Sequence, residues 1–400
     1  MNGWPVVPLS SFLRERRESP KEEDLETGAT RIISKIRFDG TIEFRVTSET
    51  KTNMILAYPG DLVISGINAA KGAIAILNEQ LSVPVAATIH YGAYSINTAL
   101  MNPSYLWWYL RSAPFREELL RANPGGIKSE LKAGRLLPLG MPLPPLEEQI
   151  LIVDLITRLA EDIAQVSRRQ TDSASAADSL VFSICERALN DLEADYPTVP
   201  LAELVDATRG ISYGVIQTGT PTPNGVSTLR AGDLRWFFVD TRNVKRINPA
   251  IDAAYQRTHL QGGELLLRIR GGVGELAVCP PEMVGGNVSR EIAVIPLKHA
   301  IVPEYVMYIL AAPANQKRLL RDTKGTSYVG VNLADVRKLL IPIAPKARQV
   351  QVVERIDALR SMAEALKALY AQTRVTIDAI IPSVLDRAFR GELTNCKVLS

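Results

Sequence analysis

Two stretches of the chain repeat apolar side chains at every third or fourth position. The first follows Pro145 and the second follows Pro345. This spacing places the apolar positions on one face of an α-helix, so each stretch is predicted to be a single helix of about 65 Å at about 1.5 Å per residue. The small residues 173–177 weaken the first helix, and Pro382 predicts a kink or stagger in the second. The two apolar stripes consist of Ile150, Val153, Ile156, Leu159, Ile163 and Val166, and of Val350, Val353, Ile356, Leu359, Ala363 and Leu366.

The segments that precede these helices mix short β-like runs with turns rich in Gly, Pro and Asn. A helix is expected near the end of each segment, beginning at Pro103 and at Pro303, because proline suits the first turn of a helix. Each segment is therefore predicted to be a globular domain of mixed strands and helices. The clearest strand-like runs are residues 61–65, 73–77, 264–269 and 292–296.

The chain contains an internal repeat. The segment Pro142-Leu-Pro-Pro-Leu-Glu-Glu-Gln149 aligns with Pro342-Ile-Ala-Pro-Lys-Ala-Arg-Gln349 at an offset of 200 residues (Gln149 to Gln349). Nearer the start of each copy the offset drifts, as insertions would cause: Gly60-Asp-Leu-Val63 aligns with Gly263-Glu-Leu-Leu266, and Trp4-Pro5 aligns with Tyr196-Pro197. A repeat of this length indicates a duplicated structural unit.

A duplicated order of domain, helix, domain, helix predicts an α+β fold in which the two long helices bury their stripes against each other as an antiparallel coiled coil. Two globular mixed α/β domains would then be separated by the helices, with a pseudo-twofold internal repeat. The predicted boundaries are a first globular domain over 1–143, a central helix over 144–193, a second globular domain over 194–343, a distal helix over 344–394 and a tail over 395–400.

The composition of the chain is that of an ordinary globular protein, with 46% hydrophobic and 22% charged residues and a net charge of +3. This charge permits a nucleic-acid partner without requiring one. The odd number and wide spacing of the three cysteines (Cys185, Cys279, Cys396) favour neither a disulfide framework nor a metal site. The chain shows no signal-peptide core and no apolar run of membrane-spanning length, so a cytoplasmic protein is expected.

Catalytic motifs are scarce. The three histidines stand in unrelated contexts and are expected to be solvated or hydrogen-bonded. Asn102-Pro-Ser-Tyr105 is similar to the loop that holds the target amino group in adenine methyltransferases, but its repeat mate begins with Val302, which favours a helix start in both copies. The glycines of 271–274 lie between two strand-like runs, so we expect a tight β connection and not a dinucleotide site.

Basic residues form two clusters in the second half of the chain. Arginine can contact both phosphates and base edges, so the clusters are compatible with DNA binding. A solvated surface would explain many of these residues equally well. The first cluster contains Arg230, Arg235, Arg242, Lys245, Arg246, Arg257, Arg268 and Arg270, and the second contains Lys317, Arg318, Arg321, Lys324, Arg337 and Lys338.

The repeated motifs resemble those of the specificity subunits of Type I restriction–modification systems. Residues 142–149, which open the first long helix, are similar to that family's conserved-region signature, and Leu385-Asp-Arg-Ala-Phe-Arg-Gly-Glu-Leu-Thr394 is similar to the end of its second long helix. Residues 60–65, 211–217, 229–233 and 286–290 resemble patterns of its target-recognition domains. The resemblance covers essentially the whole chain.

The resemblance implies a non-catalytic subunit that binds double-stranded DNA. Each recognition domain would read one half of a bipartite site, and the helices would fix the spacer between the halves. Two modification (methyltransferase) subunits and the restriction (translocase/endonuclease) subunits would be its partners. S-adenosylmethionine, ATP and Mg would serve only those partners, and this chain would hold no cofactor or metal.

The predicted DNA contacts are polar and basic side chains on glycine-flanked loops, although simple turn chemistry is an alternative for Asn68 and Asn287. They are Ser65, Asn68, Lys71 and Lys128 in the first domain, and Tyr213, Gln217, Arg230, Arg268, Arg270, Asn287, Arg290 and Tyr328 in the second.

The starts of the long helices are the predicted partner-binding sites, through Leu146, Glu147 and Gln149 in the first and Lys346 and Gln349 in the second. The second motif is degenerate, which predicts interfaces of different strength. Two other functions remain open: a self-contained DNA methyltransferase, and a coiled-coil adaptor without DNA specificity.

Overall fold

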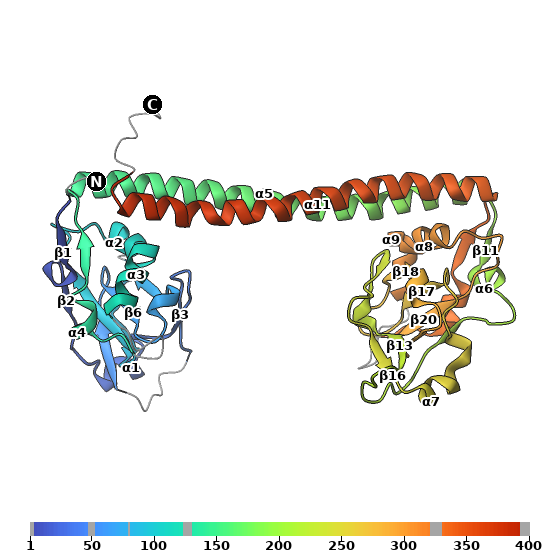
Figure 1. Ribbon diagram of the computed structural model, residues 1–400, viewed down its shortest axis with the longest axis horizontal. Helices are drawn as coiled ribbons and strands as arrows, with labels where there is room; N and C mark the ends of the chain where they lie inside the picture. Colours follow the sequence, from blue (N-terminus) through green and yellow to red (C-terminus); the bar gives the residue numbers. More distant parts are fainter. Residues whose placement is uncertain (1–3, 47–52, 79–80, 123–129, 321–329, 393–400) are drawn as a thin grey trace. The chain divides into compact units, whose positions relative to one another are not determined.

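The computed structural model describes residues 4–46, 53–78, 81–122, 130–320 and 330–392 of the 400-residue chain (Figure 1). The chain divides into two compact units. Unit 1 comprises residues 1–169 and 371–400, and unit 2 comprises residues 170–370. Each unit therefore combines a globular part with a portion of both long helices, α5 (Leu146–Asp195) and α11 (Lys346–Phe389).

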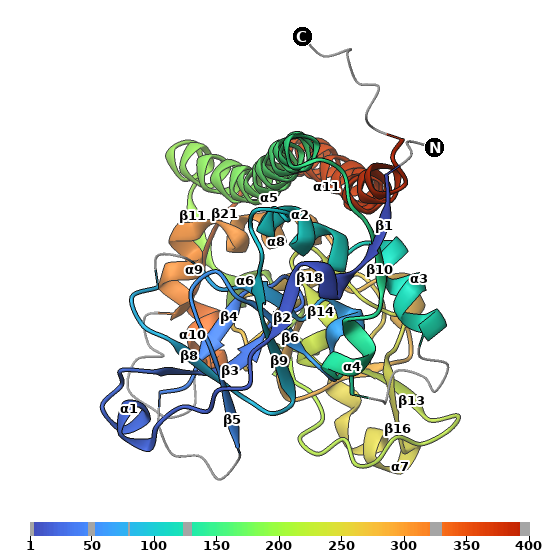
Figure 2. The same ribbon diagram turned by 90° about the vertical axis from the view of Figure 1, so that its left-hand side faces the viewer.

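Unit 1 contains three sheets. A two-stranded antiparallel ladder joins β1 to β10, an antiparallel sheet has the order β2-β9-β6-β7, and a mixed sheet has the order β4-β3-β8-β5 with β3 parallel to β8. Figure 2 shows β2 and β9 of this unit side by side. The strands are β1 (Val6–Pro8), β2 (Leu13–Glu15), β3 (Arg31–Ile36), β4 (Ile42–Phe44), β5 (Met54–Ala57), β6 (Leu62–Ser65), β7 (Ile74–Ile76), β8 (Val85–Thr88), β9 (Tyr91–Ile96) and β10 (Gly140–Pro142).

The helices of unit 1 cover the antiparallel sheet and connect it to α5. Tyr105 and Tyr109 of α2 pack edge-on against Phe389, the last residue of α11, and Ile156 of α5 lies in the same core. The first turns of α5 and the last turns of α11 are therefore part of one hydrophobic core with the globular part of unit 1. The shorter helices are α1 (Glu22–Glu26), α2 (Pro103–Leu110), α3 (Ala113–Ala122) and α4 (Ala133–Leu136), with 3-10 turns η1 (Leu9–Ser11) and η2 (Ala69–Lys71).

Unit 2 contains an antiparallel sheet of order β12-β20-β17-β18, a mixed sheet of order β16-β13-β19 with β13 parallel to β19, and two-stranded ladders β11-β21 and β14-β15. The strands are β11 (Thr198–Pro200), β12 (Ser212–Tyr213), β13 (Val226–Leu229), β14 (Leu234–Arg235), β15 (Phe238–Val239), β16 (Lys245–Ile247), β17 (Leu265–Arg268), β18 (Leu276–Val278), β19 (Asn287–Val288), β20 (Ile292–Ile295) and β21 (Leu340–Pro342).

The core of unit 2 is built around α8, which is buried along its length, and includes Cys185 of α5 and Ile356 of α11. The helical elements are α6 (Leu201–Leu204), α7 (Pro249–Asp252), α8 (Pro303–Ala311), α9 (Pro313–Leu320) and α10 (Leu333–Lys338), with 3-10 segments η3 (Ala231–Asp233), η4 (Ala253–Thr258) and η5 (Pro281–Met283).

The repeat seen in the sequence is a repeat of topology. The ladder β1-β10 pairs Val6 with Pro142, and β11-β21 pairs Thr198 with Pro342 in the same register. The antiparallel sheets have corresponding strand orders, and each mixed sheet contains one parallel pair. The expected α+β fold with two long helices is confirmed.

The face that the long helices bury differs from the predicted stripe at its start. Ile150 is 50% exposed, whereas Gln149, Ile152 and Ile156 are buried. In α11 the buried positions are likewise Gln349, Val352 and Ile356, and Val350 is exposed. The prediction that Ile150 and Val350 begin the buried stripes is wrong, because a buried glutamine, Gln149 or Gln349, occupies the first buried position of each helix. Neither residues 173–177 nor Pro382 ends its helix.

Candidate nucleic-acid interface

One end of the antiparallel sheet in unit 2 gathers several of the predicted DNA-binding side chains. Arg268 pairs with Ile292 in the β17-β20 ladder, and Ile269 N–H donates to the Glu291 carbonyl beyond it. The same register continued places Arg270 opposite Arg290. Arg290 N–H donates to Val215 at 2.8 Å, which brings the segment after Tyr213 to this end of the sheet. Neither the Arg270 nor the Arg290 side chain has a carboxylate partner within the described residues.

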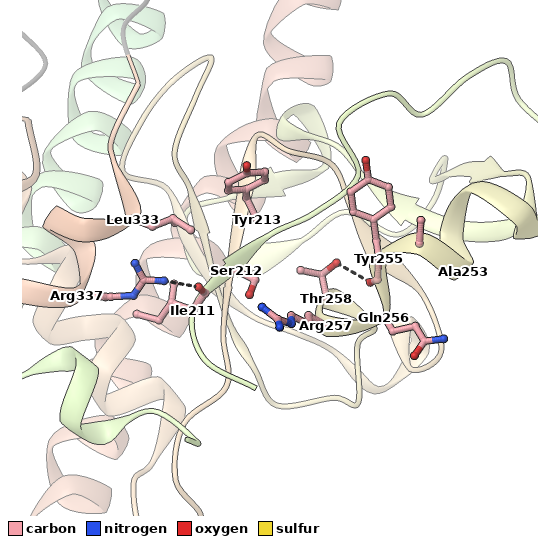
Figure 3. Close-up of a pocket in the computed structure, with 11 residues that line it drawn as sticks. Ile211, Ser212, Tyr213, Ala253, Tyr255, Gln256, Arg257, Thr258, Leu333 and Arg337 are labelled. Atoms are coloured by element: carbon pink, nitrogen blue, oxygen red, sulfur yellow. Dashed lines mark hydrogen bonds between the residues drawn. The ribbon is translucent and has the colours of Figure 1, made fainter. Parts of the chain in front are cut away.

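A hollow of about 600 Å³ opens beside this end of the sheet (Figure 3). Its walls come from three segments that are distant in sequence: residues 211–213 at β12, residues 253–258 of η4, and Leu333 and Arg337 of α10. Figure 3 shows Arg337 reaching toward Ile211, whose carbonyl accepts a hydrogen bond from Arg337 Nη2 at 2.9 Å. This hydrogen bond connects α10 to the residue that precedes β12.

The polar groups of the hollow include several that the fold itself does not use. Tyr213 is 46% exposed, and Gln256 and Arg257 are exposed on η4. Within the described part of the chain these three side chains make no hydrogen bond or ion pair, so they can serve a ligand. Tyrosine, glutamine and arginine together offer stacking, paired amide hydrogen bonds and a bidentate donor, which is the chemistry used to contact bases and phosphates.

A buried polar network fixes η4 onto β19 beneath the hollow. Asn287 donates through Nδ2 to Asp252 Oδ1 at 2.8 Å and accepts through Oδ1 from Thr258 Oγ1 at 2.7 Å. His259 Nε2 lies 2.7 Å from Asp252 Oδ2. The Tyr255 carbonyl lies 3.0 Å from Thr258 Oγ1 and is a second acceptor for the same hydroxyl proton (Figure 3). The network holds both ends of η4 and therefore sets the position of Gln256 and Arg257.

This network corrects the prediction that Asn287 contacts DNA. Its side chain is 0% exposed, and both of its polar atoms are bonded within the unit. Ser65 in unit 1 requires the same correction, because it is buried and its hydroxyl accepts from the Asn68 N–H at 3.3 Å.

The remaining predicted residues of unit 2 differ in exposure and in whether their side chains form ion pairs within the unit. Arg268 is bonded to Glu275 and bridges the glycine-rich β17-β18 hairpin, whose position between two strands is confirmed. Arg230 binds Asp233 at 3.3 Å but remains about half exposed. Gln217 is exposed, and Tyr328 lies outside the described residues.

In unit 1 the predicted residues Asn68 and Lys71 lie together in the β6-β7 connection. Lys71 is exposed, with its ammonium 5.8 Å from the Phe38 ring centroid. Arg111, which follows the last residue of α2, donates from Nη1 to the Gly72 carbonyl at 2.8 Å and holds the connection in place. Burial lowers the pKa of Arg111, although this guanidinium stays charged at neutral pH. Lys128 lies outside the described residues.

Some of the clustered basic residues are neutralised locally. Arg242 lies 2.6 Å from Asp240, and its hydrogen bonds hold the pKa of Asp240 at about 2. The sequence cluster therefore overstates the free positive charge at this position. The exposed Arg257 and the partly engaged Arg337 belong to the same two clusters, yet only the fold brings them into one hollow.

At the starts of the long helices, the predicted partner contacts fall into two groups. Leu146, Glu147 and Lys346 are exposed. Gln149 and Gln349 are buried, which corrects their predicted role. Gln149 Oε1 accepts from Asn102 N–H at 2.8 Å, and Gln349 Oε1 accepts from Val302 N–H at 3.0 Å. These glutamines join each long helix to the start of α2 or α8.

The Asn102-Pro-Ser-Tyr105 motif and its repeat mate at Val302 each form the start of a helix. Asn102 Oδ1 accepts from Tyr105 N–H at 3.1 Å and caps α2, and α8 begins at the equivalent Pro303, so the predicted helix start in both copies is confirmed. Among the residues that the structure describes, no three His, Cys, Asp or Glu side chains are grouped to hold a metal ion. No described helix is both long and apolar enough to cross a membrane.

Known proteins of one class are similar to this chain. The sequence profile described as "Type I restriction modification DNA specificity domain" matches residues 222–372. The chain is 27% identical over 311 residues to the type I restriction enzyme EcoBI specificity subunit of Escherichia coli, a match that covers 72% of this chain and 65% of that protein. It is 18% identical over 428 residues to the EcoKI specificity subunit of Escherichia coli strain K12, covering 98% of this chain and 89% of that subunit.

Solved structures show the same fold. A chain from a study of complex assembly and conformational transition of the type I R-M system aligns with a TM-score of 0.70 at 19% identity, covering 98% of this chain and 99% of that one. The HsdS subunit from Thermoanaerobacter tengcongensis aligns with a TM-score of 0.57 at 18% identity, covering 98% of each. Residues 222–372 match a type I restriction modification DNA specificity domain, and the chain as a whole is similar to the specificity subunits of type I restriction enzymes in sequence and to their solved structures in fold.

Proposed function

We propose that the protein reads a bipartite DNA sequence, with one half-site recognised by each globular unit. The observation that carries this proposal is the duplication: both units have one topology, but their loops carry different side chains. Unit 2 has the hollow with Tyr213, Gln256 and Arg257, and the β6-β7 connection of unit 1 presents Asn68 and Lys71. Two units that share a topology but differ in their surface side chains are suited to bind two half-sites of different sequence.

In unit 2 the proposed reading surface comprises the hollow and the adjoining sheet end with Arg270 and Arg290. Exposed arginines there would position the DNA backbone, and arginine or glutamine would contact base edges in the major groove. Asn287 and its buried partners would act only by holding η4. Arg230 and Gln217 remain candidates at the margin of this surface, and Arg268 contributes to the shape of the hairpin.

We propose that the long helices set the gap between half-sites and bind the other subunits of the complex. Each helix passes without a break from one unit to the other, over Leu146–Asp195 and Lys346–Phe389. The partners would be two modification subunits, through faces that include Leu146, Glu147 and Lys346, together with restriction subunits. Methyl transfer from S-adenosylmethionine and ATP- and Mg-dependent cleavage would belong to those subunits, on cytoplasmic DNA, and this chain would catalyse neither reaction.

An exchange of one recognition domain tests the modular reading of DNA. Residues 1–143 are replaced by the corresponding domain of another specificity subunit, and the complex with modification subunits is used to select bound duplexes from a random pool. The expected result is one changed half-site, an unchanged second half-site and an unchanged gap. Alteration of both half-sites would contradict the proposal. Methyl transfer from labelled S-adenosylmethionine by the purified chain alone would contradict the non-catalytic role.

A further inference from the structure

A groove runs along the paired helices of unit 2, between α5 and α11. It encloses about 290 Å³, and its floor is apolar, with Ile184, Val352 and the 54% exposed Leu180. Arg187, Arg348 and Arg355 line it together with Asp191. The long helices thus present an apolar surface with basic edges, away from the hollow described above.

The arginines of this groove are available for a partner. Arg348 makes only a long contact of 3.5 Å to the Gln351 side chain, and within the described residues none of the three arginines has a carboxylate within 4 Å. Three guanidinium groups against one aspartate leave the groove positively charged. Exposed charges of one sign beside apolar side chains favour an occupant with the complementary pattern.

The internal repeat supplies a direct comparison in unit 1. At the offset of 200 residues, Arg348, Gln351 and Arg355 correspond to Glu148, Leu151 and Leu155. Leu151 is 68% exposed and Leu155 is 37% exposed. The corresponding face of unit 1 therefore replaces a basic edge with an acidic residue and two exposed leucines.

The charged side chains on the unit 1 face also have partners within the unit. Glu148 accepts a hydrogen bond from Trp4 Nε1 at 3.0 Å. Arg387, the counterpart of Arg187, lies 3.8 Å from Glu392. The unit 1 face is therefore apolar with partnered charges, whereas the unit 2 groove is apolar with arginines that have no carboxylate partner among the described residues.

We propose that the groove of unit 2 binds an acidic, partly apolar segment of a modification subunit, and that the equivalent face of unit 1 holds a second copy mainly through Leu151 and Leu155. This inference rests on the proposed binding of two modification subunits. The apolar floor favours a protein segment over DNA, because phosphates gain nothing from Leu180 or Ile184. The two copies are then held by different physical forces.

A change of salt concentration distinguishes ion pairs from apolar contacts. Exposed ion pairs weaken as the Debye length falls from about 10 Å at 0.1 M to about 3 Å at 1 M salt, whereas apolar contacts do not weaken in this way. The complex of the full chain with co-expressed modification subunit is measured by sedimentation at these two salt concentrations. Two bound copies are expected at low salt, and one copy, at unit 1, is expected at high salt.

Two designed variants assign the copies to their faces. Arg348→Glu with Arg355→Glu is expected to leave one bound copy even at low salt. Gln351→Leu with Arg355→Leu gives unit 2 the leucines of unit 1 and is expected to retain two copies at high salt. Arg168→Glu with Arg169→Glu, which reverses two exposed charges on α5 away from the groove, is the matched control and should behave as the unaltered chain.

The outcomes separate the inference from the function on which it rests. Two copies that survive high salt and the Arg348→Glu, Arg355→Glu change would overturn the inference and leave the proposed function standing. Loss of DNA affinity by that variant with both copies retained would assign the groove to DNA and also overturn it. A chain that binds no modification subunit at either salt concentration would contradict the proposed function itself.

Discussion

Arg209 Nη1 lies 2.7 Å from the buried carboxylate of Glu264 in unit 2, and Arg16 Nε lies 2.9 Å from the buried carboxylate of Asp61 in unit 1. Each acid immediately precedes an inner strand of its antiparallel sheet, Asp61 before β6 and Glu264 before β17. Each arginine adjoins the edge strand of the same sheet: Arg16 follows β2, and Arg209 precedes β12. The duplicated pair shows that the repeat preserves a buried interaction while loops around it diverge. Such pairs hold a strand in place but are costly to break on one side only.

Removal of one partner should therefore destabilise the corresponding unit. Arg209→Met is expected to lower the free energy of unfolding of unit 2 by about 3–5 kcal/mol, because the Glu264 charge loses its partner in a dry site. Arg16→Met should cost less, since Arg16 is more exposed than Arg209. Urea unfolding of the full chain measures both values. The double variant Arg209→Met, Glu264→Leu should recover most of the loss, and no recovery would contradict this account of the pair.

The buried glutamines at the helix starts should be intolerant of apolar replacement. Gln149→Leu leaves the Asn102 N–H and the Leu100 and Pro144 carbonyls without a partner, at about 1–3 kcal/mol for each group that water cannot reach. Gln349→Leu removes fewer bonds, to Val302 and Ala344, and should cost less. Hydrogen exchange at the Asn102 and Val302 amides reports the change directly. Unchanged protection in both variants would show that these bonds do not hold the helices to α2 and α8.

Substitution in the hollow should affect one half-site alone. Arg257→Ala and Tyr213→Ala are each expected to weaken binding of the specific duplex by roughly tenfold, equivalent to about 1.4 kcal/mol, with the loss confined to the half-site read by unit 2. Lys298→Ala is the control and should change little, because Lys298 lies beyond the end of β20 that is opposite to Arg290. Duplexes mutated in one half-site at a time make the measurement. Equal losses on duplexes lacking either half-site would indicate a general effect on folding or charge.

The buried thiols should resist alkylation in the folded chain. Burial raises the pKa of Cys185 and of Cys279 to about 12, so roughly one thiol in ten thousand is ionised at pH 8. Because the folded state binds these protons more tightly, their contribution to stability is complete below the pKa of a free thiol, near 8.5, and is lost as pH rises toward 12. Mass spectrometry after iodoacetamide treatment should find both unmodified until urea unfolds the chain. Rapid labelling of Cys185 at pH 8 without denaturant would contradict its placement in the core.

Much of the architecture could be predicted from the sequence because duplication is visible in its most regular parts. The sequence predicts the helix starts that follow Pro145 and Pro345, the helix starts at Pro103 and Pro303, and the β17-β18 hairpin from local patterns that need no knowledge of the fold. The exact buried face of the long helices did not follow, because Gln149 is polar in sequence but buried through hydrogen bonds to a distant helix start.

The site was harder to predict, since its walls converge from distant segments. Residues 211–213, 253–258 and 333–337 meet only through the tertiary fold, so Gln256 could not be distinguished from other exposed polar residues. Asn287 was selected because it lies in a glycine-flanked motif, yet the same motif places it under η4 as a buried anchor. Composition indicates which side chains are available, and the fold decides which of them face outward.

The helices offer a prediction about spacing that follows from their regular rise. Insertion of seven residues between Val166 and Ser179, with a matched insertion in α11, adds about 10 Å to each helix and should lengthen the gap by about three base pairs. The half-sites themselves should stay the same. Duplex selection with the altered complex makes this measurement, and changed half-sites with an unchanged gap would argue against the helices as the spacer.

The reading of two half-sites by the two units is tested most directly by the methylome of a host that expresses this chain together with modification subunits. We expect methylated adenines within a split motif: two short specified sequences separated by a gap of fixed length and unspecified sequence. Exchange of residues 1–143 should then replace only one of the two. A single contiguous motif, or methylation without sequence preference, would contradict the reading of two half-sites by two duplicated units.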